Sequence, residues 1–286
     1  MTQPGAVADT VSPRALLELA LVAAREAGDL LVRTRPQGLR AEATKTSPTD
    51  VVTEMDRASE RLLRERLLAR RPGDAILGEE GGASSGSSGV RWVIDPVDGT
   101  VNYLYGLPHW AVSVAAEVAG QVVAGVVHAP ELGHTWTATV DSPACRDGLP
   151  VSVSDPDGLA MALVATGFGY TSARRARQAR VLTGVLPRVR DIRRAGAASV
   201  DLCLVASGAV DGYYEQGLKP WDLAAGALIA TRAGARVGGL SGQPPGERML
   251  VAAAPGIFDE LVGLLAALDA DDDPRADPST DPPQGD

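Results

Sequence analysis

The sequence predicts an α+β protein in which mixed sheets and helices alternate in layers. Apolar residues recur at helical spacing over residues 16–31 and 55–67, whereas short apolar runs such as 111–118 and 121–128 are typical of buried strands. Both halves of the 286-residue chain contain both kinds of element. Because a sheet and a helix each bury an apolar face against another element, this mixture favours stacked sheets covered by helices.

In the first half, Ser12 and Pro13 form a typical helix start, with serine as the cap and proline at the first helical position. Ala119 and Gly120 fit the turn of a tight hairpin. Residues 81–89 have the Gly/Ser composition of a linker, so we expect a mobile surface loop there. The expected helices cover residues 13–31 and 53–70, and the expected strands cover 75–77, 92–95, 111–118, 121–128 and 135–140.

In the second half, Pro187 is expected to end a helix, because proline lacks the amide that continues the hydrogen-bond ladder. Proline, glycine and aspartate gather over residues 143–158 and mark a soft boundary. It separates an N-terminal half (13–147) from a C-terminal half (148–268). The expected helices of the second half cover residues 172–186, 199–207, 221–233 and 257–267, and the expected strands cover 160–166, 211–215 and 249–254.

Charge is unevenly distributed along the chain. The net charge is −9, and residues 269–286 carry seven Asp and one Arg, which is −6 and leaves −3 for the rest. We expect this acidic, proline-rich tail and residues 1–12 to be disordered. A nearly neutral body gives no basic footprint for nucleic acid. The lack of signal-peptide features, of a 20-residue apolar span and of closely spaced cysteines predicts a cytoplasmic protein without membrane contact.

The most informative segment is an apolar run that ends in Asp95-Pro96-Val97-Asp98-Gly99-Thr100. Proline favours a tight turn, and Gly99 allows a ligand to approach the backbone closely. Two carboxylates at this spacing can converge on one cation, and oxygen ligands without Cys or His suit Mg²⁺ or Mn²⁺. The alternative is a turn with two solvated aspartates.

Other acidic residues also stand at the ends of apolar elements: Asp56, Glu79, Glu80 and Asp222. For Asp222, an acid in the first turn of a helix that is favoured only by the helix dipole is an equal alternative. If these side chains converge, a metal must offset their repulsion. Two divalent ions bridged by a carboxylate would favour in-line attack at phosphorus, so the residues point to metal-dependent hydrolysis of a phosphate ester.

Four motifs in order resemble the inositol monophosphatase family, over about residues 14–268. The segment 95–100 matches its D-P-[IV]-D-G-T motif, and residues 45–56 match K-S-S-P-x-D-x-V-T-x-x-D except that Thr46 stands at the first serine. Residues 78–80 match G-E-E, and residues 221–234 match W-D-x-A-A-G-x-L-I-x-x-x-A-G. The segment 212–222 is similar to that of the bacterial, particularly actinobacterial, inositol-1-monophosphatases.

The resemblance implies a layered αβαβα sandwich, two to three Mg²⁺ ions per active site (with Mn²⁺ an alternative) and hydrolysis of inositol-1-phosphate by an activated water. It assigns a catalytic role to Asp56, Thr100 and Glu79. The implied metal ligands are Glu79, Asp95, the carbonyl of Val97, Asp98 and Asp222. The implied substrate contacts are Gly99, Thr100, Gly196, Ala198 and Glu215, and Lys45 matches a residue near a mobile loop. The resemblance also implies a lithium-sensitive homodimer.

Two further positions depart from the family pattern: Val101 replaces a second threonine, and Arg232 replaces an acid. Neither removes a metal ligand. The rival substrates are histidinol phosphate, fructose-1,6-bisphosphate and 3′-phosphoadenosine 5′-phosphate. Glu215 favours a neutral polyol and disfavours a second phosphate, although Arg193, Arg194 and Lys219 could supply positive charge. A different class of function is a binding module of the transcription machinery, with RNA polymerase as partner.

Overall fold

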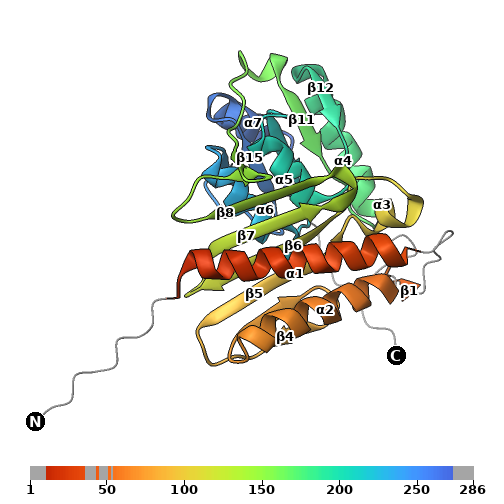
Figure 1. The fold of residues 1–286 in the computed structure, drawn as a ribbon. Coiled ribbons are helices and arrows are strands. Elements are labelled where there is room, and N and C mark those ends of the chain that lie inside the picture. Colours follow the sequence, from red (N-terminus) through yellow and green to blue (C-terminus); the bar gives the residue numbers. More distant parts are fainter. Residues whose placement is uncertain (1–10, 36–42, 45–50, 53, 273–286) are drawn as a thin grey trace, which may run out of the picture.

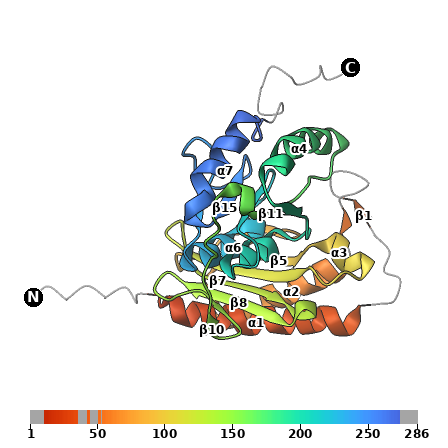
Figure 2. The same cartoon turned by 90° about the horizontal axis from the view of Figure 1, so that it is seen from above.

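The computed structural model describes residues 11–35, 43–44, 51–52 and 54–272. Its secondary structure is arranged in five layers, helix–sheet–helix–sheet–helix, which confirms the predicted αβαβα sandwich (Figures 1 and 2). The helices are α1 (Pro13–Thr34), α2 (Glu54–Arg70), α3 (Thr100–Tyr105), α4 (Ser172–Val185), α5 (Ala198–Ala206), α6 (Pro220–Arg232) and α7 (Pro255–Ala267). None of these helices is long and apolar enough to cross a bilayer.

The first outer layer consists of α1 and α2, which cover one face of the larger sheet. The hydroxyl oxygen of Ser12 accepts a hydrogen bond from the amide of Ala15, and Pro13 occupies the first helical position, as the sequence predicts. The buried face of α1 is rich in small residues, including Ala20, Ala23 and Ala27. Small side chains let the helix lie close to the sheet, where leucines and the buried Trp92 fill the remaining space.

The larger sheet has eight strands in the order β10-β9-β8-β7-β6-β5-β3-β4. All its neighbouring strands are antiparallel except β3 and β5, which run parallel. The carboxyl ends of β3 and β5 therefore lie at the same edge. The strands are β3 (Ala75–Gly78), β4 (Gly82–Ser84), β5 (Val90–Asp98), β6 (Ala111–Val118), β7 (Gln121–Ala129), β8 (His134–Thr139), β9 (Cys145–Arg146) and β10 (Leu149–Pro150).

Helices α5 and α6 form the middle layer and pack against each other between the two sheets. The smaller sheet has five strands in the order β12-β11-β13-β15-β14, and β11 is parallel to both of its neighbours. These strands are β11 (Leu163–Thr166), β12 (Asp191–Arg193), β13 (Gly212–Glu215), β14 (Arg236–Gly238) and β15 (Leu250–Ala253). Helices α4 and α7 cover its outer face.

Every expected helix and strand is present, with ends within three residues of the prediction. Residues 81–89 are all exposed, but they are not simply a loop, because β4 pairs there with β3 as an edge strand. The expected turn at Asp95 was also wrong: β5 continues to Asp98, with a shift of register between these two residues. Pro96 has no amide to donate to the ladder, which suits an interrupted register at this point.

At the chain ends, the described structure extends beyond the predicted body. Ala270 is buried, and the carbonyl of Asp272 accepts a hydrogen bond from the side chain of Gln216. Residues 1–10 and 273–286, which hold most of the two segments expected to be disordered, lie outside the described residues, as does Lys45. The short strands β1 (Ala43–Thr44) and β2 (Val51–Val52) pair with each other in antiparallel orientation.

Candidate metal centre

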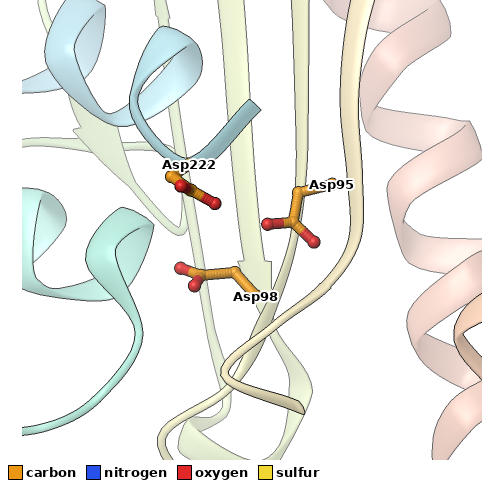
Figure 3. Close-up of side chains that lie close together, drawn as sticks. All are labelled: Asp95, Asp98 and Asp222. Atoms are coloured by element: carbon orange, nitrogen blue, oxygen red, sulfur yellow. The ribbon is translucent and has the colours of Figure 1, made fainter. Parts of the chain in front are cut away.

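Three aspartates from two different elements converge on one point. Each of Asp95, Asp98 and Asp222 offers a carboxylate oxygen, and these oxygens all lie within 4.8 Å of one another. Figure 3 shows the three side chains pointing toward a common space between β5 and the start of α6. The register shift in β5 has a direct consequence, because it lets two aspartates on the same strand face the same point.

Asp98 is held in place by the N-terminus of α5. Its carboxylate accepts hydrogen bonds from the amide of Ala198 (3.3 Å) and from both the amide (2.7 Å) and the hydroxyl (2.5 Å) of Ser199. Helix α5 has no side-chain cap of its own at Ala197. The aspartate therefore satisfies amides that the first turn leaves without partners, and the helix fixes the direction of the carboxylate.

Asp222 and Asp95 each use one oxygen locally. The amide of Lys219 donates to Oδ2 of Asp222 at 2.6 Å, so Asp222 caps the first turn of α6, and the same carboxylate belongs to the acidic cluster that could bind a metal. The amide of Val97 donates to Oδ1 of Asp95 at 3.0 Å. Each bond orients the carboxylate, and the oxygens that converge can serve a cation.

Burial makes this cluster costly without a cation. Burial raises the pKa of Asp98 above its ordinary value even though three hydrogen bonds favour its ionised form. Burial, followed by the charges of Asp98 and Glu79, raises the pKa of Asp222 well above its ordinary value. A divalent cation would offset this repulsion, and an all-oxygen donor set fits Mg²⁺ or Mn²⁺. The residues present therefore fit the expected metal.

Glu79 reaches the site from the neighbouring strand β3. It follows the carboxyl end of β3, which is parallel to β5, and it lines the same cavity as Asp98 and Asp222. The residue that holds this turn was not predicted from the sequence. Glu60 of α2 is buried and accepts hydrogen bonds from the amides of Glu80 (2.7 Å) and Gly81 (2.8 Å).

Asp56 and Thr100 also meet, as expected. Asp56 is fully buried, and its Oδ1 lies 3.0 Å from the hydroxyl oxygen of Thr100. That hydroxyl oxygen also lies 3.1 Å from the carbonyl oxygen of Val97, so the hydroxyl proton has two possible acceptors. Gly99 has φ of 87°, and an added Cβ would come within 2.9 Å of the carbonyl oxygen of His109, so both conformation and space require glycine here.

A cavity of about 370 Å³ opens beside the aspartates. It brings together most of the predicted ligand contacts: Glu79, Asp98, Gly99, Gly196, Ala198, Glu215 and Asp222. Arg194 and Lys219, which the sequence analysis considered as sources of positive charge, also line it. Arg174 of α4 and Gly167 are additional lining residues that we did not predict, because no motif links them to the acidic cluster.

Glu215 occupies the side of the cavity that belongs to the smaller sheet. The hydroxyl of Tyr213 donates to its Oε2 at 2.6 Å. Burial raises the pKa of Glu215 to about 7, although the Tyr213 hydrogen bond and the charges of Arg194 and Arg174 act in the opposite direction. Behind this pair lies Asp201, whose pKa burial and the charge of Glu215 raise well above the ordinary value.

The chain is similar to known proteins over most of its length. The family model described as the inositol monophosphatase family matches residues 12–269. The chain is 47% identical over 263 residues to inositol-1-monophosphatase SuhB of Mycobacterium tuberculosis (strain H37Rv), which covers 86% of this chain and 88% of the relative. It is 38% identical over 256 residues to the Nus factor SuhB of Pasteurella multocida, covering 87% of this chain and 95% of the relative.

Among solved structures, the extragenic suppressor protein suhB of Bartonella henselae superposes with a TM-score of 0.83 at 33% identity. The match covers 88% of this chain and 98% of that one.

Proposed function

Because this chain belongs to the inositol monophosphatase family, we propose that it is a Mg²⁺-dependent phosphomonoester hydrolase that converts inositol-1-phosphate to inositol and phosphate. The observation that carries the proposal is the convergence of Asp95, Asp98 and Asp222 beside a cavity large enough for a phosphorylated sugar alcohol. Glu79 and the carbonyl of Val97 would complete the ligand set. Two to three bound ions would stabilise negative charge at phosphorus and lower the pKa of a water.

The residues of this chain would then orient the reacting groups. The Thr100 hydroxyl, when it donates to Asp56, has a lone pair free to accept a hydrogen bond from the attacking water. Asp56 is buried, so its charge acts through Thr100 in a medium where screening is weak. We assign the amides of Gly99 and Thr100 to the phosphate, because the left-handed Gly99 brings the backbone up to the cavity.

The residues that line the cavity influence which phosphorylated alcohol can bind. Glu215 can accept hydrogen bonds from hydroxyl groups, while Gly196 and Ala198 provide a small, uncharged wall beside it. Histidinol phosphate carries a cationic amine, and Arg174, Arg194 and Lys219 around the cavity would repel it. We therefore favour the neutral polyol over histidinol phosphate.

Fructose-1,6-bisphosphate is the second candidate, because the same arginines favour an additional phosphate. Arg194 is exposed, and its guanidinium lies over the ring of Phe168 at 5.9 Å from the centroid. Glu215 opposes a second phosphate from within the cavity, so we rank this substrate below inositol-1-phosphate. 3′-Phosphoadenosine 5′-phosphate also carries two phosphates, so we give it the same rank as fructose-1,6-bisphosphate.

A substrate panel tests the proposal. The purified protein with Mg²⁺ should release phosphate from inositol-1-phosphate with the highest kcat/KM among these four esters, and EDTA should abolish turnover. Asp98→Asn should also abolish it while the protein stays folded, because the substitution removes a metal charge and keeps the shape. Retained turnover in Asp98→Asn, or a higher kcat/KM for another ester, would overturn the metal assignment or the substrate assignment, respectively.

The relatives named Nus factor SuhB favour one further role, association with RNA polymerase. It would be additional, because the metal-site residues are present here. Retention of RNA polymerase on the immobilised protein at physiological salt, from an extract of the source cells, would support this association, and no retention would reject it.

Sedimentation of the purified protein tests the expected homodimer, and LiCl titration of turnover tests the expected lithium sensitivity.

A further inference from the structure

The ends of two parallel strands meet at Glu215. Thr166, the last residue of β11, pairs with Tyr214 of β13, so Gly167 and Glu215 are the next residues on two neighbouring strands. Both line the cavity. A Cβ added to Gly167 would overlap all three atoms of the Glu215 carboxyl group, so the carboxylate lies directly against the bare Cα of the glycine.

Tyr213 also contacts this carboxylate, through a hydrogen bond. Residues 213 and 215 lie two apart on β13 and therefore face the same side of the sheet. Tyr213 is fully buried, and its hydroxyl donates to Oε2 of Glu215. Burial, followed by the charges of Glu215 and Asp201, raises the pKa of this tyrosine well above its ordinary value, so the hydroxyl keeps its proton and acts as a donor.

Gly167 and Tyr213 thus leave the carboxylate of Glu215 little freedom to move. Without the tyrosine hydroxyl, one oxygen would lose a fixed donor; with a side chain at residue 167, the carboxylate could not occupy its present place. The candidate metal ligands come from other elements, namely β5, α6 and the turn after β3.

We propose that Gly167 and Tyr213 are positioning residues that make the cavity select phosphomonoesters of hydroxyl-rich alcohols, by fixing the Glu215 carboxylate where it accepts hydrogen bonds from those hydroxyls. This inference rests on the proposed phosphatase function, and it identifies two residues that determine which alcohol the enzyme prefers in its substrate. Selectivity then depends on a glycine and a tyrosine of the smaller sheet as well as on the acid that contacts the substrate.

The test uses two substrates: inositol-1-phosphate, which has five free hydroxyls, and phenyl phosphate, which has none. The readout is the ratio of their kcat/KM values. A hydrogen bond to a charged group contributes about 1.5–3 kcal/mol, so Glu215→Gln should lower this ratio about tenfold. Gly167→Ala should do the same, because the displaced group is the end of a flexible side chain and the protein can fold around the new methyl group.

Tyr213→Phe removes only the donor and adds no bulk to the cavity. We expect it to lower the ratio about fivefold, mainly through KM for inositol-1-phosphate. Tyr214→Phe is the matched control, because the neighbouring hydroxyl belongs to the opposite face of the strand, against α4 and α7. Gly263→Ala is the control for a methyl group, since an added Cβ there meets nothing within 4 Å.

A double-mutant cycle decides whether the residues act through Glu215. In the Glu215→Gln background, Tyr213→Phe and Gly167→Ala should change the ratio by less than twofold. Full additivity, or an equal loss with both substrates, would overturn the inference while leaving the phosphatase function intact. Absence of Mg²⁺-dependent turnover of both substrates by the unmodified protein would instead reject the proposed function.

Discussion

Ser199 donates two hydrogen bonds to a single carboxylate oxygen of Asp98, one from its amide and one from its hydroxyl. The two residues are about one hundred positions apart, so the start of α5 in the C-terminal half orients a candidate metal ligand of the N-terminal half. Partners that orient a ligand typically change metal affinity 10–100-fold when they are removed.

We therefore expect Ser199→Ala to weaken Mg²⁺ or Mn²⁺ binding about tenfold, with the fold preserved because both amide bonds to Asp98 remain. Calorimetric titration with Mn²⁺ measures the change. Ser87→Ala, at an exposed serine, is the control. Equal affinities in Ser199→Ala and the unmodified protein would show that the hydroxyl does not orient the ligand.

Thr100→Ala should lower kcat about a hundredfold and change KM less than threefold, because the role that we propose for the hydroxyl is to orient the water and not the substrate. Thr100→Ser keeps the hydroxyl that bonds Asp56 and should recover most of the rate. Steady-state kinetics with inositol-1-phosphate measures both. An effect confined to KM contradicts the assigned role.

Gly78→Ala should loosen the turn that carries Glu79. An added Cβ would lie 2.5 Å from Oε1 of Glu60, whose carboxylate is already fixed by two amides and by Arg64. Overpacking of this kind costs about 1–3 kcal/mol. Urea unfolding should show this loss in the free energy of unfolding, and metal binding should be weaker. Gly246→Ala is the control, because an added Cβ there meets nothing within 4 Å, and it should show neither effect.

Glu215 should give the reaction a pH dependence near neutrality. Its pKa of about 7 means that the ionised, hydrogen-bond-accepting form gains population as pH rises through 7. The ratio of kcat/KM for inositol-1-phosphate over phenyl phosphate should therefore rise between pH 6 and 8. In Glu215→Gln it should stay flat, because an amide does not titrate; a rise there would assign the effect to another group.

The same pKa has a consequence for stability. The folded pKa of Glu215 lies above the unfolded value near 4, so its contribution is fully favourable below about pH 4 and is lost as pH rises through 7. In metal-free protein, Glu215→Gln should raise Tm at pH 8 relative to the unmodified chain and have little effect on Tm at pH 4. Scanning calorimetry at both values checks the sign.

The sequence predicted the elements whose apolar pattern is long, such as α1 and the hairpin of β6 and β7, because burial imposes that pattern. It did not predict β4, β9, β10, β12 and β14, each only two or three residues long. Such strands carry too few residues for a period and depend on the partner strand for their existence.

For the site, the convergence of Asp95, Asp98 and Asp222 was predictable, because all three acids stand at the ends of apolar elements, where a ligand site can form. The residues that hold the site in place could not be predicted from the sequence. Glu60 and Tyr213 look like an ordinary surface acid and a core aromatic, and their roles follow only from what the fold places beside them. Arg174 likewise reaches the cavity from a helix whose sequence shows only a run of arginines.

The two sheets divide the site between them. The larger sheet carries Asp95 and Asp98, and the turn after its strand β3 brings Glu79, whereas the smaller sheet and its loops carry Gly167, Tyr213 and Glu215. Substitutions in the smaller sheet could therefore change which alcohol the substrate carries, while the candidate metal ligands stay the same. Exchanging β11, β13 and the residues that follow them for those of a relative, with α5 and the Asp222 of α6 kept, is thus the direct experimental route to a new substrate range.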